Sequence, residues 1–239
     1  FNTAFSRGQQ PIAINGLVWM GDVSFMRQQV FDKIDAGFDC IKLKIGALDF
    51  EVECQLLAEI RERYPAKDVT LRVDANGAFS PDEALEKLKI LAEFDLHSIE
   101  QPIAAGQHKA MADLCAKTPL PIALDEELIG VMQHDAKQKL LDDINPQYII
   151  LQPSLLGGFA ASEAWIGLAE ERHIQWWVTS ALESNVGLNA IAQWTASLHT
   201  STPQGLGTGS LFTNNIESPL VVAKGVLHHN NSLTWGYRF

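Results

Sequence analysis

Three acidic residues each end a short apolar segment of the sequence. Asp74 follows VTLRV, Glu100 follows HSI and Asp125 follows PIAL. An isolated acid in such a place usually caps a helix or is solvated, but three successive ends of parallel strands would bring the carboxylates together. Their mutual repulsion would demand a cation, and carboxylate oxygens without Cys or His partners favour Mg²⁺ or Mn²⁺ over zinc. The sequence therefore predicts a divalent metal site formed by these three residues.

Two lysines alternate with apolar residues in the segment CIKLKI at 40–45. Strand geometry places Lys42 and Lys44 on the same side of this segment. Such lysines can simply neutralise a surface, but lysines that point into a barrel are costly unless carboxylates match them. Desolvation beside a second cation and a metal lowers a lysine pKa, and a neutral lysine is a usable base. The lysines and acids together predict the removal of a proton alpha to a metal-bound carboxylate.

The elements that position these residues recur regularly along the chain. Segments with helical character lie between the apolar segments, such as 49–64, with charges on one face. Ser80-Pro81 and Ser184 supply signals for the start of two further helices. The predicted strands are 15–20, 40–45, 69–75, 97–102, 121–126, 148–154, 174–180 and a short one at 204–209.

Alternation of strand and helix over eight strands predicts an α/β fold with a closed parallel barrel. A doubly wound open sheet is the alternative, and it usually carries a glycine-rich phosphate turn after an early strand. The glycine pairs of this chain come late, at 157–158 and within 205–209, which favours the barrel.

Composition excludes several classes of partner. The chain of 239 residues is 46% hydrophobic and has a formal net charge of −11, so we expect neither nucleic acid nor an anionic membrane as partner. No segment approaches the roughly 18 to 20 apolar residues that a membrane helix needs. Cys40, Cys54 and Cys115 are odd in number and widely spaced, as expected of free thiols in the cytoplasm.

The order and spacing of KLK, VDAN, IEQP and LDEE resemble the muconate-lactonising branch of the enolase superfamily. Within that branch, NGLVWMGD, CIKLKIGALDFE, LRVDANGAFSP, PSLLGG and TSALESNVGLNAIAQW resemble the o-succinylbenzoate synthase family along nearly the whole chain. The resemblance implies a TIM-like (β/α)7β barrel and a metal-dependent dehydratase of menaquinone biosynthesis. Its substrate would be a small carboxylate.

The resemblance also assigns roles to individual residues. It makes Lys44 the base, with Lys42 beside it tuning charge and orientation. It places Gln101 among the polar groups that support the ligands. The metal ligands would be Asp74, Glu100 and Asp125, and the substrate-binding residues would be Ser180, Gly207 and Asn76.

One departure from the family lies at the end of the sixth strand. The family has a lysine before the dipeptide PS, whereas this chain has Gln152 in LQPS. A lysine there would stabilise the enolate with a full charge, and an amide offers only hydrogen bonds. We therefore count Gln152 among the catalytic positions as the substitute for the second lysine.

A second departure concerns the family's N-terminal α+β capping domain. We expect that domain to be missing from this chain, with residues 1–14 as a connector to it. The barrel is expected over 15–216, followed by a C-terminal tail over 217–239 that packs on the barrel or on the cap.

Two other functions remain open at this stage. An N-acylamino-acid racemase or dipeptide epimerase uses the same metal site, but it needs an acid and a base on opposite faces of the alpha carbon, and Gln152 cannot carry the second proton. The other alternative is a catalytically weakened barrel that binds a metal and a carboxylate.

Overall fold

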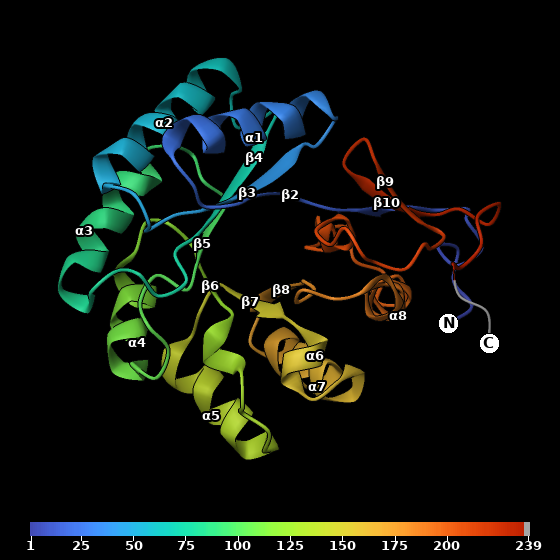
Figure 1. Ribbon diagram of the computed structural model, residues 1–239. Coiled ribbons are helices and arrows are strands. Elements are labelled where there is room, and N and C mark those ends of the chain that lie inside the picture. The colour runs from blue at the N-terminus through green and yellow to red at the C-terminus, as the bar shows by residue number, and fades with distance from the viewer. Residues whose placement is uncertain (237–239) are drawn as a thin grey trace.

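A computed structural model describes residues 1–236 of the chain (Figure 1). Residues 237–239, the end of the expected tail, lie outside this part. Within it, seven parallel strands form one sheet whose spatial order follows the sequence, and each lies inside a predicted range. They are β2 (Gly16–Val18), β3 (Cys40–Lys44), β4 (Thr70–Asp74), β5 (Ser98–Glu100), β6 (Ile122–Leu124), β7 (Tyr148–Leu151) and β8 (Gln175–Val178).

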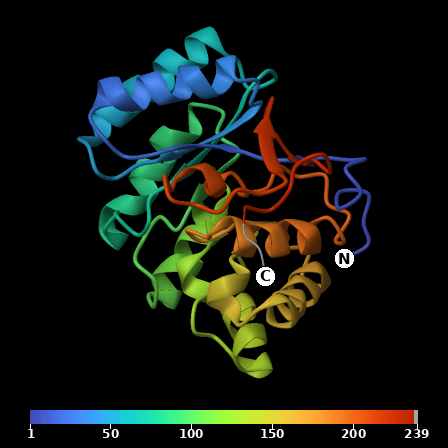
Figure 2. The same ribbon diagram turned by 45° about the vertical axis from the view of Figure 1, so that its right-hand side comes forward.

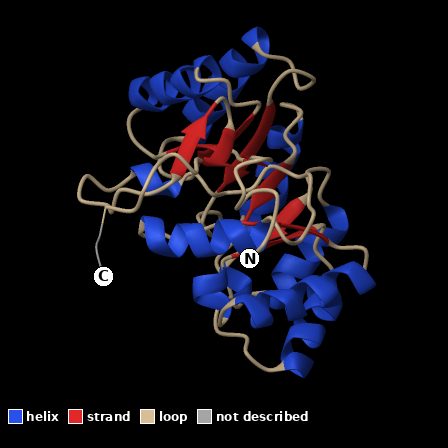
Figure 3. Cartoon of the chain, turned by 90° about the vertical axis from the view of Figure 1, so that its right-hand side faces the viewer, coloured by secondary structure: helices blue, strands red, loops and turns tan. Residues whose placement is uncertain are grey.

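Helices connect these strands and surround the curved sheet (Figures 1 and 3). None of the helices within residues 1–236 has the length and apolar character needed to cross a membrane. The helices are α1 (Val23–Asp35), α2 (Phe50–Arg63), α3 (Pro81–Ala92), α4 (His108–Lys117), α5 (His134–Ile144), α6 (Pro153–Leu156), α7 (Phe159–Glu171) and α8 (Asn185–Thr195), with short 3₁₀ turns η1 (Glu126–Leu128) and η2 (Thr208–Ser210).

The three helices that the sequence predicts individually are confirmed. Helix α2 starts after Asp49, whose carboxylate accepts a hydrogen bond from the backbone N–H of Glu51. Helix α3 starts after Ser80, and its Glu83 accepts a 3.0 Å bond from the Ser80 N–H. Helix α8 starts directly after Ser184. Polar residues thus mark all three starts, and at α2 and α3 their side chains form hydrogen bonds with backbone N–H groups there.

The predicted eighth strand at 204–209 is wrong. This segment contributes two single-residue bridges, from Gln204 to Ile14 and from Gly205 to Thr179, before the chain turns into η2. A side chain at Gly205 would collide with Thr179, so only glycine allows this approach. The two bridges close the sheet into a barrel, because Ile14 precedes β2 and Thr179 follows β8.

A second, antiparallel sheet joins the two ends of the chain (Figure 2). The hairpin of β9 (Leu220–Ala223) and β10 (Val226–His229) pairs with β1 (Ile12–Ala13), with Ile12 opposite Leu227. Residues of the expected tail therefore lie beside the expected connector. The division into connector, barrel and tail stays a prediction.

Apolar side chains fall into two clusters on opposite faces of the sheet. Outward residues such as Ile41 and Leu43 belong to the large core shared with the helices. A small inner cluster consists of Ala123, Ile150 and Trp177, with Tyr148 packed against it. The alternation of β3 directs Lys42 to the side opposite Ile41, so the polar residues of the barrel lie on its inner face.

Aromatic and cationic groups fill the barrel interior away from the carboxyl ends of the strands. The guanidinium of Arg72 lies 4.1 Å from the ring centroid of Trp177 and donates a 2.9 Å hydrogen bond to the carbonyl of Pro203. Tyr148 and His97 pack beside the same indole. Burial and the nearby Arg72 lower the pKa of His97 to about 4, so this ring is neutral near pH 7. Because these side chains fill one end of the barrel, the space for a ligand lies at the other end, where the carboxyl ends of the strands meet.

We predict that Gly46→Ala destabilises the fold more than Gly130→Ala. Both glycines have positive φ, 93° and 84°, so alanine strains the backbone at each. At Gly46 the new methyl group would also collide with Ala78, whereas nothing lies within 4 Å at Gly130. We expect a loss of about 3 kcal/mol at Gly46 and about 1 kcal/mol at Gly130, measured by urea unfolding. Equal losses would show that the two loops do not meet as described.

Candidate active site

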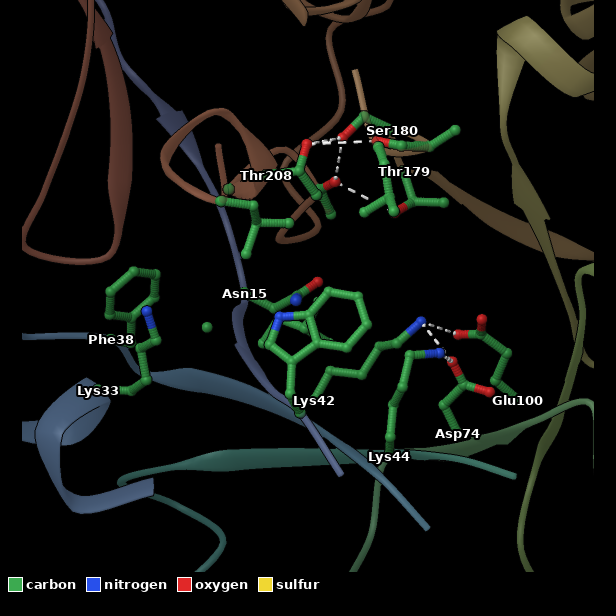
Figure 4. Close-up of a pocket in the computed structure, with 18 of the residues that line it drawn as sticks. Asn15, Lys33, Phe38, Lys42, Lys44, Asp74, Glu100, Thr179, Ser180 and Thr208 are labelled. Carbon is green, nitrogen blue, oxygen red and sulfur yellow. Dashed lines mark hydrogen bonds and ion pairs between the residues drawn. The ribbon is translucent and has the colours of Figure 1, made fainter. Parts of the chain in front are cut away.

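The nine residues to which the sequence assigns catalytic, metal-binding or substrate-binding roles all line one cavity of about 810 Å³. The cavity lies at the carboxyl ends of the strands, and Figure 4 shows the lysine and carboxylate side chains converging in it. The nine are Lys42, Lys44, Asp74, Asn76, Glu100, Asp125, Gln152, Ser180 and Gly207.

Strand register brings the charged residues together. Lys44 of β3 pairs with Asp74 of β4, and Asp74 pairs with Glu100 of β5, so the three form one row across adjacent strands. Lys42 lies two residues earlier on β3 and points to the same side. Asp125 follows β6 directly. It lies two residues after Ala123, which pairs with Glu100.

Ion pairs join this row. The Lys42 Nζ lies 2.6 Å from Glu100 Oε2 and 3.0 Å from Asp74 Oδ2. The Lys44 Nζ lies 2.9 Å from the same oxygen of Asp74. The side chain of Asp74 is 0% exposed, so one buried carboxylate is shared by two ammonium groups. Neither lysine is placed as a surface charge.

The carboxylates respond differently to this environment. Burial raises the pKa of Asp74, but Lys42 and Lys44 together outweigh burial and hold it at about 2. Burial and repulsion from Asp74 raise the pKa of Glu100 well above its ordinary value. Burial raises the pKa of Asp125 to about 6, with a further contribution from its neighbour Glu126. Two of the three acids therefore carry negative charge at a cost in free energy.

The pKa of Lys42 among the described groups shifts in the direction opposite to the one expected beside a bound metal ion. Burial lowers the pKa of Lys42, but attraction to Glu100 and Asp74 outweighs it, so the pKa lies above the ordinary value. The reason is that two carboxylates, and not a second cation, lie closest to its ammonium group. Lys42 is thus a fixed positive charge among the described groups.

Amide side chains hold Asp125 in place. The Gln152 Nε2 donates a 2.5 Å hydrogen bond to Asp125 Oδ2. The backbone N–H groups of Asp125 and Glu127 each lie 3.3 Å from Gln101 Oε1, and the Gln101 Nε2 donates to Glu127 Oε2 at 3.1 Å. Gln101 does not line the cavity; it fixes the backbone from which Asp125 projects.

Asn76 connects Lys44 to an acid that the sequence analysis did not assign. Its Oδ1 accepts a 2.6 Å bond from the Lys44 Nζ, and its Nδ2 donates a 2.7 Å bond to Glu126 Oε1. The other oxygen of Glu126 is buried without a partner among the described residues. The repeated acid in LDEE is the sequence signal that could have drawn attention to Glu126.

Hydroxyl groups lie on the side of the cavity across from the charged row. Ser180 and Thr208 share a 2.6 Å hydrogen bond between their hydroxyl groups (Figure 4). A methyl group at Gly207 would lie 3.6 Å from Ile14, so glycine is not required there for steric reasons. Sequence analysis missed Thr208 and also Trp19, whose ring lies 5.9 Å from the Lys44 Nζ, because an aromatic residue in an apolar strand is typical of a core.

The carboxylates of the cavity form an incomplete site for a divalent cation. Within residues 1–236, no group of three His, Cys, Asp or Glu side chains stands ready to hold a metal ion. Asp74 and Glu100 instead share the ammonium of Lys42, which lies where a cation would be attracted. The raised pKa of Asp125 and the unpartnered oxygen of Glu126 are both relieved by added positive charge. The carboxylate oxygens of this cluster therefore fit a hard divalent cation in their chemistry.

Comparison with known proteins defines the class. Residues 26–234 match the model of the enolase C-terminal domain-like family, so the chain belongs to that family. This confirms the fold class expected from the strand pattern and the motifs.

Individual relatives narrow the resemblance. The chain is 57% identical over 227 residues to o-succinylbenzoate synthase of Desulfotalea psychrophila, an alignment that covers 95% of this chain and 61% of the relative. The crystal structure of MenC from Desulfotalea psychrophila LSv54 has a TM-score of 0.90 and 56% identity, and covers 95% of this chain and 63% of that one. The chain is also 36% identical to N-succinylamino acid racemase of Thermus thermophilus over 155 residues, 64% of this chain and 39% of the relative.

The similarity to o-succinylbenzoate synthases that the motifs indicate is therefore confirmed. The chain spans a little over three fifths of the length of the Desulfotalea proteins it matches, 61% and 63%.

We predict that Lys42→Met destabilises the protein by about 3 kcal/mol, because it leaves the buried Asp74 and Glu100 without their shared cation. The measurement is urea unfolding at pH 7 without added metal. Lys89→Met is the matched control, since its ion pair with Glu86 is exposed and should contribute almost nothing. Equal stability of the two variants would contradict the charge balance described for the cavity.

Proposed function

We propose that this chain forms the barrel of an o-succinylbenzoate synthase, a metal-dependent lyase of menaquinone biosynthesis acting in the cytoplasm. The proposed reaction dehydrates 2-succinyl-6-hydroxy-2,4-cyclohexadiene-1-carboxylate, a small carboxylate. The observation that carries the proposal is the row of Lys44, Asp74 and Glu100 at the barrel mouth, with Lys42 beside it. The 57% identity to the Desulfotalea synthase supports this choice of reaction.

Asp74, Glu100 and Asp125 are the residues that would hold Mg²⁺ or Mn²⁺. When bound, the ion would neutralise the negative charge that develops on the substrate carboxylate during proton removal. Glu126, with its unpartnered oxygen, lies beside these ligands and adds to the attraction for a cation.

Lys44 is the proposed base. Its side chain is 15% exposed, its Nζ faces the cavity, and hydrogen bonds to Asp74 and Asn76 fix its position. In its neutral form it takes the proton from the carbon alpha to the carboxylate, and the electron pair of the broken C–H bond moves into that carboxylate. The electron pair then returns to form the ring double bond as the C–O bond breaks, and the Lys44 ammonium protonates the departing hydroxyl group, which leaves as water while the ring becomes aromatic.

The other cationic and amide groups complete the site. Lys42, whose Nζ lies within 3.0 Å of Glu100 and Asp74, places an ammonium group beside the position of the reacting carboxylate. Gln152 occupies the position of the family's second lysine. Its Nε2 donates a hydrogen bond to Asp125. Dehydration on one face needs one proton-transferring group, which Lys44 supplies.

Gln152 argues against the racemase or epimerase alternative. Such an enzyme needs a second titratable group on the opposite face of the alpha carbon, and a carboxamide neither gains nor loses a proton near pH 7. The similarity to the Thermus racemase therefore supports the shared metal site more than the shared reaction.

We predict that Lys44→Ala lowers kcat for o-succinylbenzoate formation by about 1,000-fold, the usual loss of a general base. Mg²⁺ binding should persist because the three carboxylates remain. It is measured as the rise in melting temperature when the ion is added. Lys117→Ala, on the exposed surface of α4, is the control for purification and handling. Turnover close to that of the unaltered chain would remove Lys44 from the role of base.

We also predict that Gln152→Lys raises kcat about tenfold, since a charged donor stabilises the enolate more strongly than an amide. Product formation is measured for both chains with Mg²⁺ and after chelation. Metal-dependent product from the unaltered chain supports the proposed dehydratase. Product from the lysine variant alone identifies a barrel weakened at this position, and product from neither contradicts the proposed activity.

A further inference from the structure

Gln101 links two of the three proposed metal ligands. It directly follows Glu100 at the end of β5, and its Oε1 accepts a 3.3 Å hydrogen bond from the backbone N–H of Asp125, which follows β6. The φ of Gln101 is 39°, in the left-handed region that residues other than glycine rarely adopt, so its neighbours must hold it there. The residue is buried. The orientation of its side chain therefore affects both strand ends.

Two acceptors on one side fix the orientation of the Gln101 amide. Its Nε2 donates a 3.0 Å hydrogen bond to the carbonyl of Ile103 and a 3.1 Å bond to Glu127 Oε2. Its Oε1 then faces the backbone N–H groups of Asp125 and Glu127. Because a carboxylate accepts hydrogen bonds and does not donate them, Glu127 favours the amide orientation in which the oxygen meets these two donors.

Glu127 lies outside the cavity and is itself enclosed. Its side chain is 1% exposed, and it is not among the residues that line the cavity. Its Oε1 accepts a 2.8 Å hydrogen bond from the backbone N–H of Gly106, in the loop after β5, and lies 3.0 Å from the Nε2 of the exposed His108. One oxygen of this buried carboxylate therefore holds the loop after β5, and the other orients Gln101.

We propose that Glu127 is a positioning residue for the metal site: it orients Gln101, which in turn holds the backbone that carries Asp125. The inference rests on the proposed function, in which Asp125 is one of the three metal ligands. Glu127 touches neither the substrate nor the ion. Removal of a group that orients a metal ligand from behind typically weakens metal binding about 10- to 100-fold.

The test measures the dissociation constant of Mn²⁺ from the electron paramagnetic resonance signal of the free ion, without substrate. Glu127→Ala should weaken Mn²⁺ binding about tenfold, because the Gln101 amide loses its carboxylate acceptor. Glu53→Ala is the matched control. Glu53 is also buried, and its Oε1 accepts hydrogen bonds from the N–H groups of Gly46 and Leu48, in a loop that carries no proposed ligand. This control should lose stability and keep its affinity for Mn²⁺.

A double-variant cycle tests whether Glu127 acts through Gln101. Gln101→Gly removes the amide, tolerates the positive φ and should weaken Mn²⁺ binding about tenfold. Adding Glu127→Ala to it should weaken binding no further, because the group that Glu127 orients is gone. If Glu127→Ala does not fold, Glu127→Gln replaces it. That variant offers a single acceptor oxygen to Gly106 and Gln101, and it should weaken Mn²⁺ binding about threefold.

The outcomes separate this inference from the proposed function. If the unaltered chain binds Mn²⁺ and the Glu127 variant binds it equally well, Glu127 does not position the site. Equal weakening by Glu127→Ala and Glu53→Ala would indicate a general loss of stability, and independent losses in the double variant would mean that Glu127 acts without Gln101. Each of these results overturns the inference while the proposed function stands. If the unaltered chain binds no Mn²⁺, the proposed metal site fails and the positioning role fails with it.

Discussion

The ion pairs that join Lys42 and Lys44 to Asp74 and Glu100 hold together a part of the barrel from which water is largely excluded. Buried carboxylates and ammonium groups are each expensive, and they become tolerable only when strand register sets them within hydrogen-bond distance. The rest of the site follows from this requirement. Asn76 and Gln152 take up further hydrogen bonds of Lys44 and Asp125, and Gln101 anchors the strand end that carries Asp125.

The two ends of the barrel interior divide the tasks of stability and chemistry. Trp177, Tyr148 and Arg72 fill the lower end and give the charged row a rigid base. At the mouth, the carboxylates of Asp74, Glu100, Asp125 and Glu126 outnumber the two ammonium groups of Lys42 and Lys44 beside them. Under the proposed function, this arrangement would attract a divalent cation to the mouth and place it beside Lys44.

Much of this could be predicted from the sequence, because two local rules were enough. Alternation along CIKLKI fixed the side to which Lys42 and Lys44 point, and the ends of apolar segments located Asp74, Glu100 and Asp125. What failed depends on contacts across the closed ring. The segment at 204–209 forms bridges in place of a strand, since its glycines turn the chain into η2. The pKa of Lys42 likewise depends on neighbours that are distant in sequence.

Closure of the ring through Gln204 and Gly205 has a mechanical consequence. Every other junction of the barrel is a pair of strands with at least two residues in register, whereas this one consists of single bridges on each side of a two-residue segment. The barrel is expected to deform most easily at this junction, because it has the fewest paired residues. Asn15 lies on the β2 side of this junction and Ser180 on the β8 side, so a ligand that contacts both would span the junction. Ligand binding in the cavity and closure of the barrel are then coupled, because a ligand that contacts both sides of the junction also holds the barrel closed.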